Sequence, residues 1–377
     1  MNLSVQSAIA WLTSIVGALL AALSAIALYF IAALFGAAKR RGELAPRVEA
    51  IGLGAVTNFF DTLGIGSFAP TTAYMKLRKM APDSYFPAIL NAGHALPTVA
   101  QALIFITLVQ VDPVLLISCI VASCAGAFVG APIVQRSPIR VVQGVVGVAL
   151  LIAATLYALA NLGLMPVGGD ALTLPPVLFA AAVAGHFVMG VLMMFGIGLY
   201  APSLVLLSLL GLNPVAAFPI MMGSCAFLMP ISSLNFVRSE RIDLRIVLGI
   251  ALGGIPAVLL AAFVVKSLDL VTLRWLVVVV VLYASGLLLN GAFRGQEDSA
   301  SVGPPLSAQT TAWLLTVVGV AGMALTYLYR PPGNIGEAIA MMAQGHEVAL
   351  KEPFFVAGLA VFGLLTLAGV VGLIRAK

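Results

Sequence analysis

The chain has 377 residues, of which 62% are hydrophobic and only 9% are charged. A mean hydropathy of +1.12 excludes a water-soluble globular protein. Apolar runs of about 20 residues recur along it, and each is long enough to cross a hydrocarbon layer of about 30 Å as a helix. We therefore expect an all-α polytopic membrane protein whose surface contacts the lipid bilayer. The net charge of +5 is accounted for by Lys and Arg in cytoplasmic loops, so no nucleic-acid partner is expected.

The first apolar run extends from Ala8 to Ala38 and ends at Lys39, Arg40 and Arg41. A long apolar segment followed by a basic cluster is typical of a transmembrane anchor that stops on the cytoplasmic side. We predict an N-terminal anchor and basic cytoplasmic loop over residues 1–49, with the N-terminus outside.

Two glycine-containing motifs follow, NFFDTLGIGSFAP (58–70) and GVLMMFGIGLYAP (190–202), and their glycine pairs lie 132 residues apart. The same spacing relates FPAILNAGHALP (86–97) to FPIMMGSCAFLMP, which begins at Phe218. Each copy continues into a helix with closely spaced small residues, GAFVG (126–130) or GIALGG (249–254), a pattern that permits close packing of helices. These correspondences predict two internal repeats, over 50–162 and 175–291.

The 19 Lys and Arg residues distinguish two topologies for the glycine-broken segments. If each segment crosses the membrane, the cations divide 10 to 9 between the two sides, which gives no orientation signal. If each segment enters and returns as a helical hairpin, the division becomes 15 to 4. The positive-inside rule therefore favours re-entrant hairpins over two parallel repeats of four crossings.

With hairpins, each repeat contains one broken helical hairpin and three transmembrane helices. An odd number of crossings inverts the second repeat relative to the first. Two C-terminal helices over 308–377 complete the expected chain, and the C-terminus is predicted inside. Inverted repeats with discontinuous helices are typical of secondary transporters, whose substrate sites lie near the membrane midplane.

A chain that reverses inside the membrane leaves backbone groups which lipid cannot satisfy, so the reversals must face protein or a wet cavity. Near Ser67 and Leu199 the returning helices direct free N–H groups inward, an arrangement that suits a small anion. Hydroxyl, amide and imidazole groups nearby would complete the site. The substrate-binding candidates are Gly64, Gly66, Ser67, Thr71, Asn91, His94, Gly196, Gly198, Ser203 and Ser224.

Asp61 is the only acidic residue well inside a membrane span of either repeat, and Met193 occupies its position in the second copy. An acid within the membrane is expensive and commonly relays a proton or a cation. Asn58, one helical turn earlier, is the second candidate for ion coupling. The alternative is that Asp61 is a structural acceptor that caps the returning helix. His94 and His186 could titrate, or could be packing histidines that are hydrogen-bonded within the core.

Several methionines, among them Met193 and Met229, accompany Cys225 and leave a soft-metal (copper) transporter as an alternative. Core packing is the commoner role of such residues. A non-transporting scaffold or sensor is a further alternative, although it would not need helix breaks. The chain contains no HExxH or GxSxG motif and no paired acids, so neither an enzyme nor a cofactor is expected, and no metal site is assigned. A second copy of the chain is left open as a partner.

The two hairpin motifs GIGSFAP and GIGLYAP, each followed by its FP-containing helix, resemble the TauE/SafE sulfite-exporter-like permeases over about 50–291. The resemblance implies a multi-pass permease of the bacterial inner membrane. It implies secondary transport of small sulfur-containing anions such as sulfite, thiosulfate or sulfoacetate. Family hairpins are often richer in glycine, whereas Phe68 and Tyr200 follow the glycine pairs here.

Overall fold

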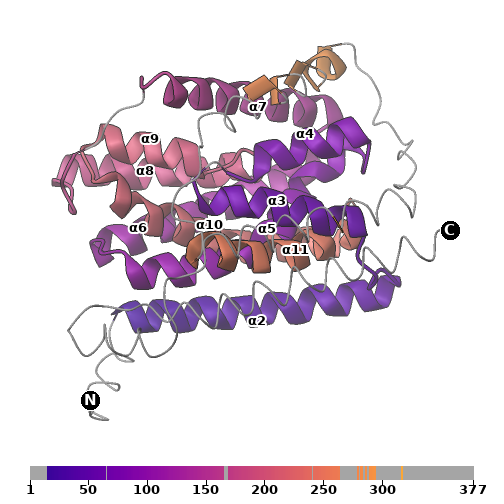
Figure 1. The fold of residues 1–377 in the computed structure, drawn as a ribbon, viewed down its shortest axis with the longest axis horizontal. Coiled ribbons are helices and arrows are strands. Elements are labelled where there is room, and N and C mark those ends of the chain that lie inside the picture. The colour runs from indigo at the N-terminus through magenta and orange to yellow at the C-terminus, as the bar shows by residue number, and fades with distance from the viewer. Residues whose placement is uncertain are drawn as a thin grey trace, which may run out of the picture.

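The computed structural model describes residues 15–64, 66–164, 169–239 and 241–263, with scattered positions between 278 and 293 and Thr316. These residues are almost entirely helical (Figure 1). The helices are α2 (Ile15–Arg41), α3 (Val48–Thr62), α4 (Phe68–Arg78), the short 3₁₀ helix η1 (Asp83–Tyr85), α5 (Phe86–Leu108), α6 (Pro113–Arg136), α7 (Ile139–Asn161), α8 (Pro176–Met193), α9 (Tyr200–Leu209), α10 (Pro214–Arg238) and α11 (Leu244–Phe263).

Seven segments in the described part of the chain are long and apolar enough to cross a membrane. They correspond to α2, to η1 with α5, and to α6, α7, α8, α10 and α11. The expectation of an all-α, multi-pass membrane protein is therefore confirmed. The predicted C-terminal helices over 308–377, and most of the last predicted helix of the second repeat, lie outside the described residues.

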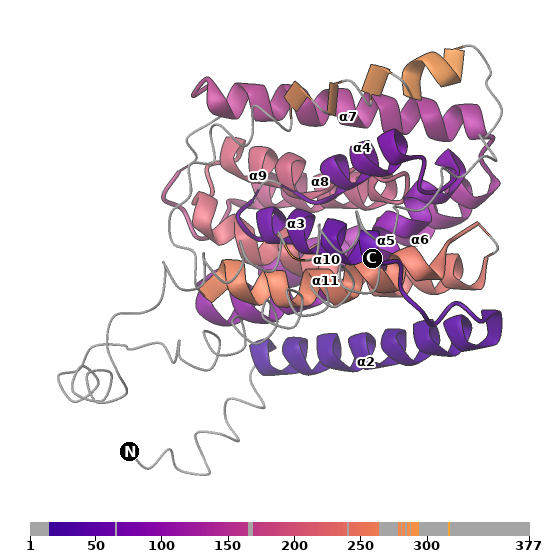
Figure 2. The same cartoon turned by 45° about the vertical axis from the view of Figure 1, so that its right-hand side comes forward.

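Helices α5 and α10 form the centre of the bundle. In their most apolar windows 78% and 83% of residues are buried, compared with 22% in α2. Helices α2 and α7 lie at opposite edges (Figures 1 and 2). Both central helices carry buried polar residues among apolar ones, and their central position holds these polar groups away from lipid.

Two segments turn back inside the bundle. Helix α3 ends at Thr62, the chain reverses through Gly64 and Gly66, and α4 returns to the end from which α3 started. Arg47, just before α3, donates to the carbonyl of Met80, just after α4, over 3.0 Å. A second reversal joins α8 to α9 through Gly196. We call α3–α4 hairpin 1 and α8–α9 hairpin 2.

The predicted close packing at the small-residue helices is confirmed. A Cβ added to Gly126 of α6 would lie 2.0 Å from the carbonyl oxygen of Phe187 in α8. A Cβ on Gly253 of α11 would lie 1.9 Å from the carbonyl oxygen of Ile51 in α3. Only glycine allows these backbones to approach so closely. The entering limb of each hairpin thus packs on a small-residue helix from the other half of the sequence.

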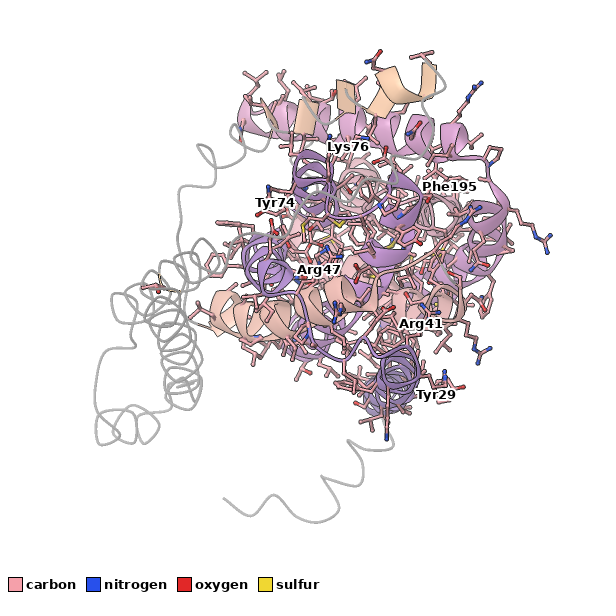
Figure 3. The ribbon with its side chains drawn as sticks, turned by 90° about the vertical axis from the view of Figure 1, so that its right-hand side faces the viewer. Tyr29, Arg41, Arg47, Tyr74, Lys76 and Phe195 are labelled. Carbon is pink, nitrogen blue, oxygen red and sulfur yellow. The ribbon has the colours of Figure 1, made fainter. Side chains whose placement is uncertain are left out.

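The loops that carry the cations gather at one end of the bundle. Arg41 donates to the carbonyls of Val237 and Ser239, and Arg47 pairs with Asp243 at 2.7 Å. Figure 3 looks onto this end and labels Arg41, Arg47 and Lys76. Every Lys and Arg of the described residues lies here, in 39–47, 76–79, 136–140 or 238–245.

The opposite end is formed by the connections before α6, between α7 and α8, and before α10. The backbone N–H of Asn213 donates to the carbonyl of Ala171 over 2.8 Å and ties two of these connections together. Within the described residues this end carries Asp112 and Asp170 and no Lys or Arg. The charge asymmetry along the bundle axis is therefore complete for this part of the chain.

Candidate functional site

The returning helices of the two hairpins begin near each other in the centre of the bundle. A Cβ added to Gly198, just before α9, would lie 3.6 Å from the Cβ of Phe68, the first residue of α4. Neither Ser67 nor Leu199 caps its helix with a side-chain hydrogen bond. Two positively polarised helix N-termini therefore converge on one region of the core.

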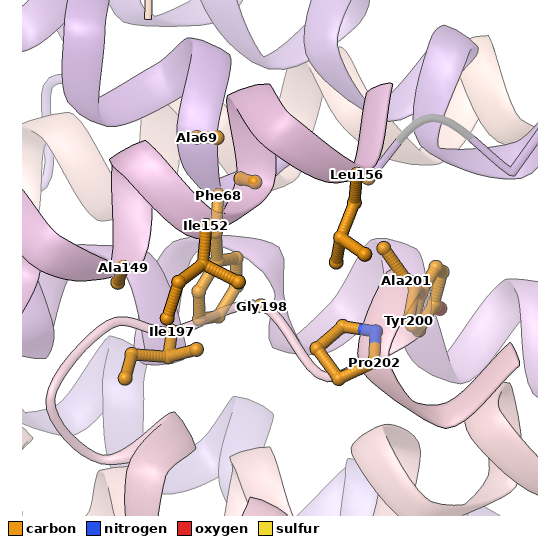
Figure 4. Close-up of a pocket in the computed structure, with 12 residues that line it drawn as sticks. Phe68, Ala69, Ala149, Ile152, Leu156, Ile197, Gly198, Tyr200, Ala201 and Pro202 are labelled. Atoms are coloured by element: carbon orange, nitrogen blue, oxygen red, sulfur yellow. The ribbon is translucent and has the colours of Figure 1, made fainter. Parts of the chain in front are cut away.

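Two adjoining cavities occupy this junction. The smaller, of about 20 Å³ and here called the Asp61 cavity, is lined by Asp61, Gly66, Ser67, Phe68, Thr98, Met193, Gly198, Leu199, Tyr200, Cys225 and Met229. The larger, of about 40 Å³ and here called the α7 cavity, is closed on one side by Ala149, Ile152 and Leu156 (Figure 4). Gly66, Phe68, Gly198 and Tyr200 line both. These volumes hold about one to three water molecules, so the helices must separate before an oxyanion can enter.

Asp61 lies in the last turn of α3 and is 3% exposed. Its carboxylate faces the hydroxyl and the backbone N–H of Ser67, at the start of α4. It also accepts a hydrogen bond of 2.9 Å from Nε2 of Gln101 in α5. The carboxylate is therefore both the structural acceptor at the N-terminus of α4 and a wall of the cavity, so the two roles considered for it are compatible.

Gln101 connects the two hairpins. Its Nε2 donates to Asp61 and, over 2.9 Å, to the hydroxyl of Thr62. Its Oε1 accepts from the hydroxyl of Tyr200, at the start of α9. The hydroxyl proton of Thr62 is donated to the carbonyl of Asn58, so Thr62 must accept from Gln101. That requirement places the amide nitrogen towards hairpin 1 and the amide oxygen towards hairpin 2.

His94 joins α5 to both limbs of hairpin 1. Its Nδ1 lies 2.9 Å from Oδ1 of Asn58, and its Nε2 lies 3.1 Å from the hydroxyl of Thr71. The amide nitrogen of Asn58 donates to the carbonyl of Gly54, which leaves Oδ1 to accept from His94. In the neutral tautomer with its proton on Nδ1, His94 accepts the proton of Thr71 at Nε2. Asn58 is therefore hydrogen-bonded to His94 and to the carbonyl of Gly54, and neither of its side-chain polar atoms is bonded to Asp61.

His186 makes the matching contact in hairpin 2. Its Nδ1 donates to the carbonyl of Ala182, and its Nε2 lies 3.0 Å from the hydroxyl of Ser203. Ser203 is 132 residues after Thr71, the spacing that relates the two motifs. A buried histidine therefore contacts the returning-helix hydroxyl of both hairpins, although His94 comes from α5 and His186 from hairpin 2 itself.

The remaining predicted site residues divide into turn positions and buried polar groups. Gly64, Gly66 and Gly196 have φ of +88°, +88° and +91°, conformations that favour glycine. Asn91 donates to the carbonyl of Met193 over 3.1 Å and so anchors the end of α8 to α5. Ser224, in α10, is fully buried and has no hydrogen-bond partner within the described residues.

The structure thus brings Asp61, Gly66, Ser67 and Gly198 into one cavity, while Thr71, Asn91, His94 and Ser203 hold the hairpins around it. Two residues of the site, Tyr200 and Gln101, were not among the predicted site residues. An aromatic residue in an apolar run resembles core packing, and Gln101 follows His94 by seven positions on one helix face.

Sulfur atoms line another part of the Asp61 cavity. Sγ of Cys225 lies 3.7 Å from Sδ of Met193, and Met229 lines the same space. All three side chains are almost fully buried. Met193 stands where the first motif has Asp61, so the sequence position that carries the acid in one hairpin carries a thioether in the other.

Comparisons with known proteins returned no family model, no curated protein and no solved structure that matches this chain.

Proposed function

We propose that this protein is a secondary transporter that moves a small anion across the membrane together with a proton. The observation that carries the proposal is the Asp61 cavity, in which one buried carboxylate shares a space with two converging helix N-termini. The helix N-termini would bind the anion. The proposed activity involves no covalent step and no cofactor.

Two inverted repeats are part of this proposal. Hairpin 1 enters from the cation-rich end and hairpin 2 from the opposite end, with their returning helices nearly in line (Figure 1). Positive φ at Gly64 and Gly196, and the matched Thr71 and Ser203 contacts, support equivalence of the hairpins. Broken helices that meet near mid-membrane are the usual substrate site of such transporters.

The electrostatics of the cavity supports coupling to protons. The ionised carboxylate of Asp61 already lies at the N-terminus of α4, where it interacts favourably with the helix dipole. The N-terminus of α9 has no equivalent acid, because Met193 replaces it. An anion bound at α9 would lie beside a like charge in a site of low dielectric constant, unless Asp61 is protonated. We infer that the anion and the proton bind together.

The substrate class, the location and the orientation follow from the resemblance and the charges. We propose a small sulfur-containing anion as substrate and the bacterial inner membrane as the location. The cation-rich end would be cytoplasmic by the positive-inside rule, which places the start of α2 outside. A homodimer is compatible with this arrangement.

Asp61→Asn tests the coupling. In proteoliposomes, uptake by the unaltered protein should depend on a proton gradient, whereas the variant should lose the gradient-driven component, a fall of about tenfold or more. Asp170→Asn, which removes an exposed carboxylate from a loop, is the matched control and should retain gradient-driven uptake. If uptake by Asp61→Asn responds to the proton gradient as strongly as uptake by the unaltered protein, Asp61 does not carry the coupling proton.

A soft-metal transporter is the second candidate, favoured by the three sulfur side chains around the same cavity. Thioether and thiolate ligands select Cu(I). A thermal-stability screen of the purified protein against sulfite, thiosulfate, sulfonates, carboxylates and Cu(I) separates the candidates. Stabilisation by an anion supports the first proposal, and stabilisation by Cu(I) alone replaces it with the second.

A further inference from the structure

Tyr200 stands between the two cavities, and its hydroxyl is hydrogen-bonded to two residues of α5, Gln101 and Thr98. It is the first residue of α9, and its ring lines both the Asp61 cavity and the α7 cavity. Figure 4 shows its ring beside Pro202 at the wall of the α7 cavity. Its hydroxyl donates to Oε1 of Gln101 in α5. Displacing Tyr200 would therefore join the two cavities into one space.

Gln101 has no spare donor in the arrangement observed. One Nε2 hydrogen is bound by Asp61 and the other by Thr62, while Oε1 accepts from Tyr200. The bond to Asp61 is charge-assisted while that carboxylate is ionised. A change in charge on Asp61 therefore changes the strength of its hydrogen bond with the Gln101 amide. Because the same amide accepts from Tyr200, that change also affects the hydrogen bond to Tyr200.

Protonation of Asp61 changes the preferred partners of the amide. A carboxylic acid and a primary amide can form two hydrogen bonds with each other, O–H to the amide oxygen and N–H to the carbonyl oxygen of the acid. Turning the amide towards the acid for this pair would take Oε1 of Gln101 out of line with the hydroxyl of Tyr200. At the same time the N–H bond from Gln101 loses its charge assistance.

We propose that Gln101 and Tyr200 are positioning residues that convert protonation of Asp61 into opening of the Asp61 cavity. With Asp61 ionised, the amide of Gln101 holds Tyr200 and the cavity is closed. With Asp61 protonated, the amide pairs with the acid, the Tyr200 hydroxyl loses its acceptor and keeps only its contact with Thr98, and α9 moves away from α5. This inference rests on the proposed function, because it assigns the site that opens when the coupling proton binds.

The neighbours of Asp61 are consistent with this assignment. Tyr200 from α9 and Cys225 from α10 are the titratable groups in electrostatic contact with it. Ser67 from α4 and Gln101 from α5 contribute uncharged donors. His94, the other titratable group of α5, is engaged by Asn58 and Thr71. Asp61 is thus the acid whose charge the amide of Gln101 senses directly.

Cys225 provides a native reporter of the opening, because its thiol lines the Asp61 cavity. In a Cys119→Ala, Cys124→Ala background it is the only cysteine of the chain. Its rate of alkylation by a small membrane-permeant maleimide can be measured in detergent from pH 5 to pH 8. Each rate is divided by that of the unfolded protein at the same pH, which removes the intrinsic reactivity of the thiol. Transport is not needed for this measurement.

Cys225 should be protected at the higher pH and become at least fivefold more reactive as the pH falls. Asp61→Asn, Gln101→Met and Tyr200→Phe should each give the reactive state at every pH. Matched controls are Gln143→Met, which removes a buried amide that donates to Asp83, and Tyr74→Phe, whose hydroxyl donates to Glu49. Both controls should keep the pH response of the parent.

Protection of Cys225 in Tyr200→Phe, or an unaltered pH response in Asp61→Asn, overturns the proposal. Circular dichroism and elution volume of each variant establish that it is folded, and Gln101→Glu serves as a second variant if Gln101→Met is unstable. If the unaltered protein transports no anion in proteoliposomes but its Cys225 still becomes more reactive as the pH falls, the proposed function is refuted and the switch stands. The two proposals are therefore tested separately.

Discussion

At the scale of single residues, the buried polar groups divide into those that hold the hairpins and those that face the cavity. His94, Asn58 and Thr71 satisfy one another within the core. Asp61 instead faces a cavity and is held by an amide from another helix. A membrane interior penalises any unpaired polar group, so the first set stabilises the fold while the second can respond to a ligand.

His94→Leu should lower the stability of the folded protein, because it leaves the Oδ1 of Asn58 and the hydroxyl of Thr71 unpaired. The expected loss is about 1–3 kcal/mol. Thermal unfolding of the purified protein checks this in a double-mutant cycle with Thr71→Val, which should show a coupling of about 0.5–3 kcal/mol. Thr107→Val, at an exposed position of the same helix, should be additive with His94→Leu. Additivity with Thr71→Val would contradict the assigned hydrogen bond.

At the scale of secondary-structure elements, glycine residues allow the entering limb of each hairpin to pack closely against a neighbouring helix. Gly54 of α3 faces the backbone of Ile250 in α11, where an added Cβ would lie 2.3 Å from a carbonyl oxygen. Gly52, two positions earlier in α3, would meet nothing within 4 Å. The two glycines have the same helical backbone and differ only in their surroundings.

Gly54→Ala should therefore separate α3 from α11 and destabilise the protein by about 1–3 kcal/mol. Gly52→Ala should be neutral or stabilising by up to about 1 kcal/mol, because alanine is the better helix former. Thermal unfolding of both variants in the same detergent makes the comparison. Equal effects of the two substitutions would show that close packing at Gly54 does not hold hairpin 1.

At the scale of the whole molecule, charge is segregated along the bundle axis. Every described Lys and Arg lies at one end, which contains the turn between α6 and α7. The connection between α7 and α8 lies at the other end and carries an acid instead. Transmembrane proteins retain Lys and Arg on the cytoplasmic side, so this segregation predicts orientation.

Single cysteines in a cysteine-free background test that orientation in intact bacterial cells. Thr173→Cys, in the connection before α8, should react with a membrane-impermeant thiol reagent. Ser137→Cys, between α6 and α7, should react only after the membrane is permeabilised. The reverse result would invert the proposed topology without altering the fold.

The membrane class, the positions of the chain reversals and the close packing of the small-residue helices could all be predicted from the amino-acid sequence. Apolar length, glycine pairs and small-residue spacing are local properties that the sequence displays directly. It also identified Asp61, since a carboxylate in an apolar run is costly wherever the chain folds. The charge count of the hairpin topology agrees with the gathering of the described cations at one end.

The pairing of the buried polar groups became visible only in the folded structure. Polar side chains such as those of Thr71, Ser203 and Asn58 could in principle bind a ligand. In the structure each is instead hydrogen-bonded to a histidine or to a neighbouring backbone carbonyl. Tyr200 and Gln101, 99 residues apart, were brought together by the crossing of hairpin 2 and α5. A hydrogen bond between distant segments requires the donor and acceptor to be placed to within a few tenths of an ångström. No local pattern in the sequence encodes that placement.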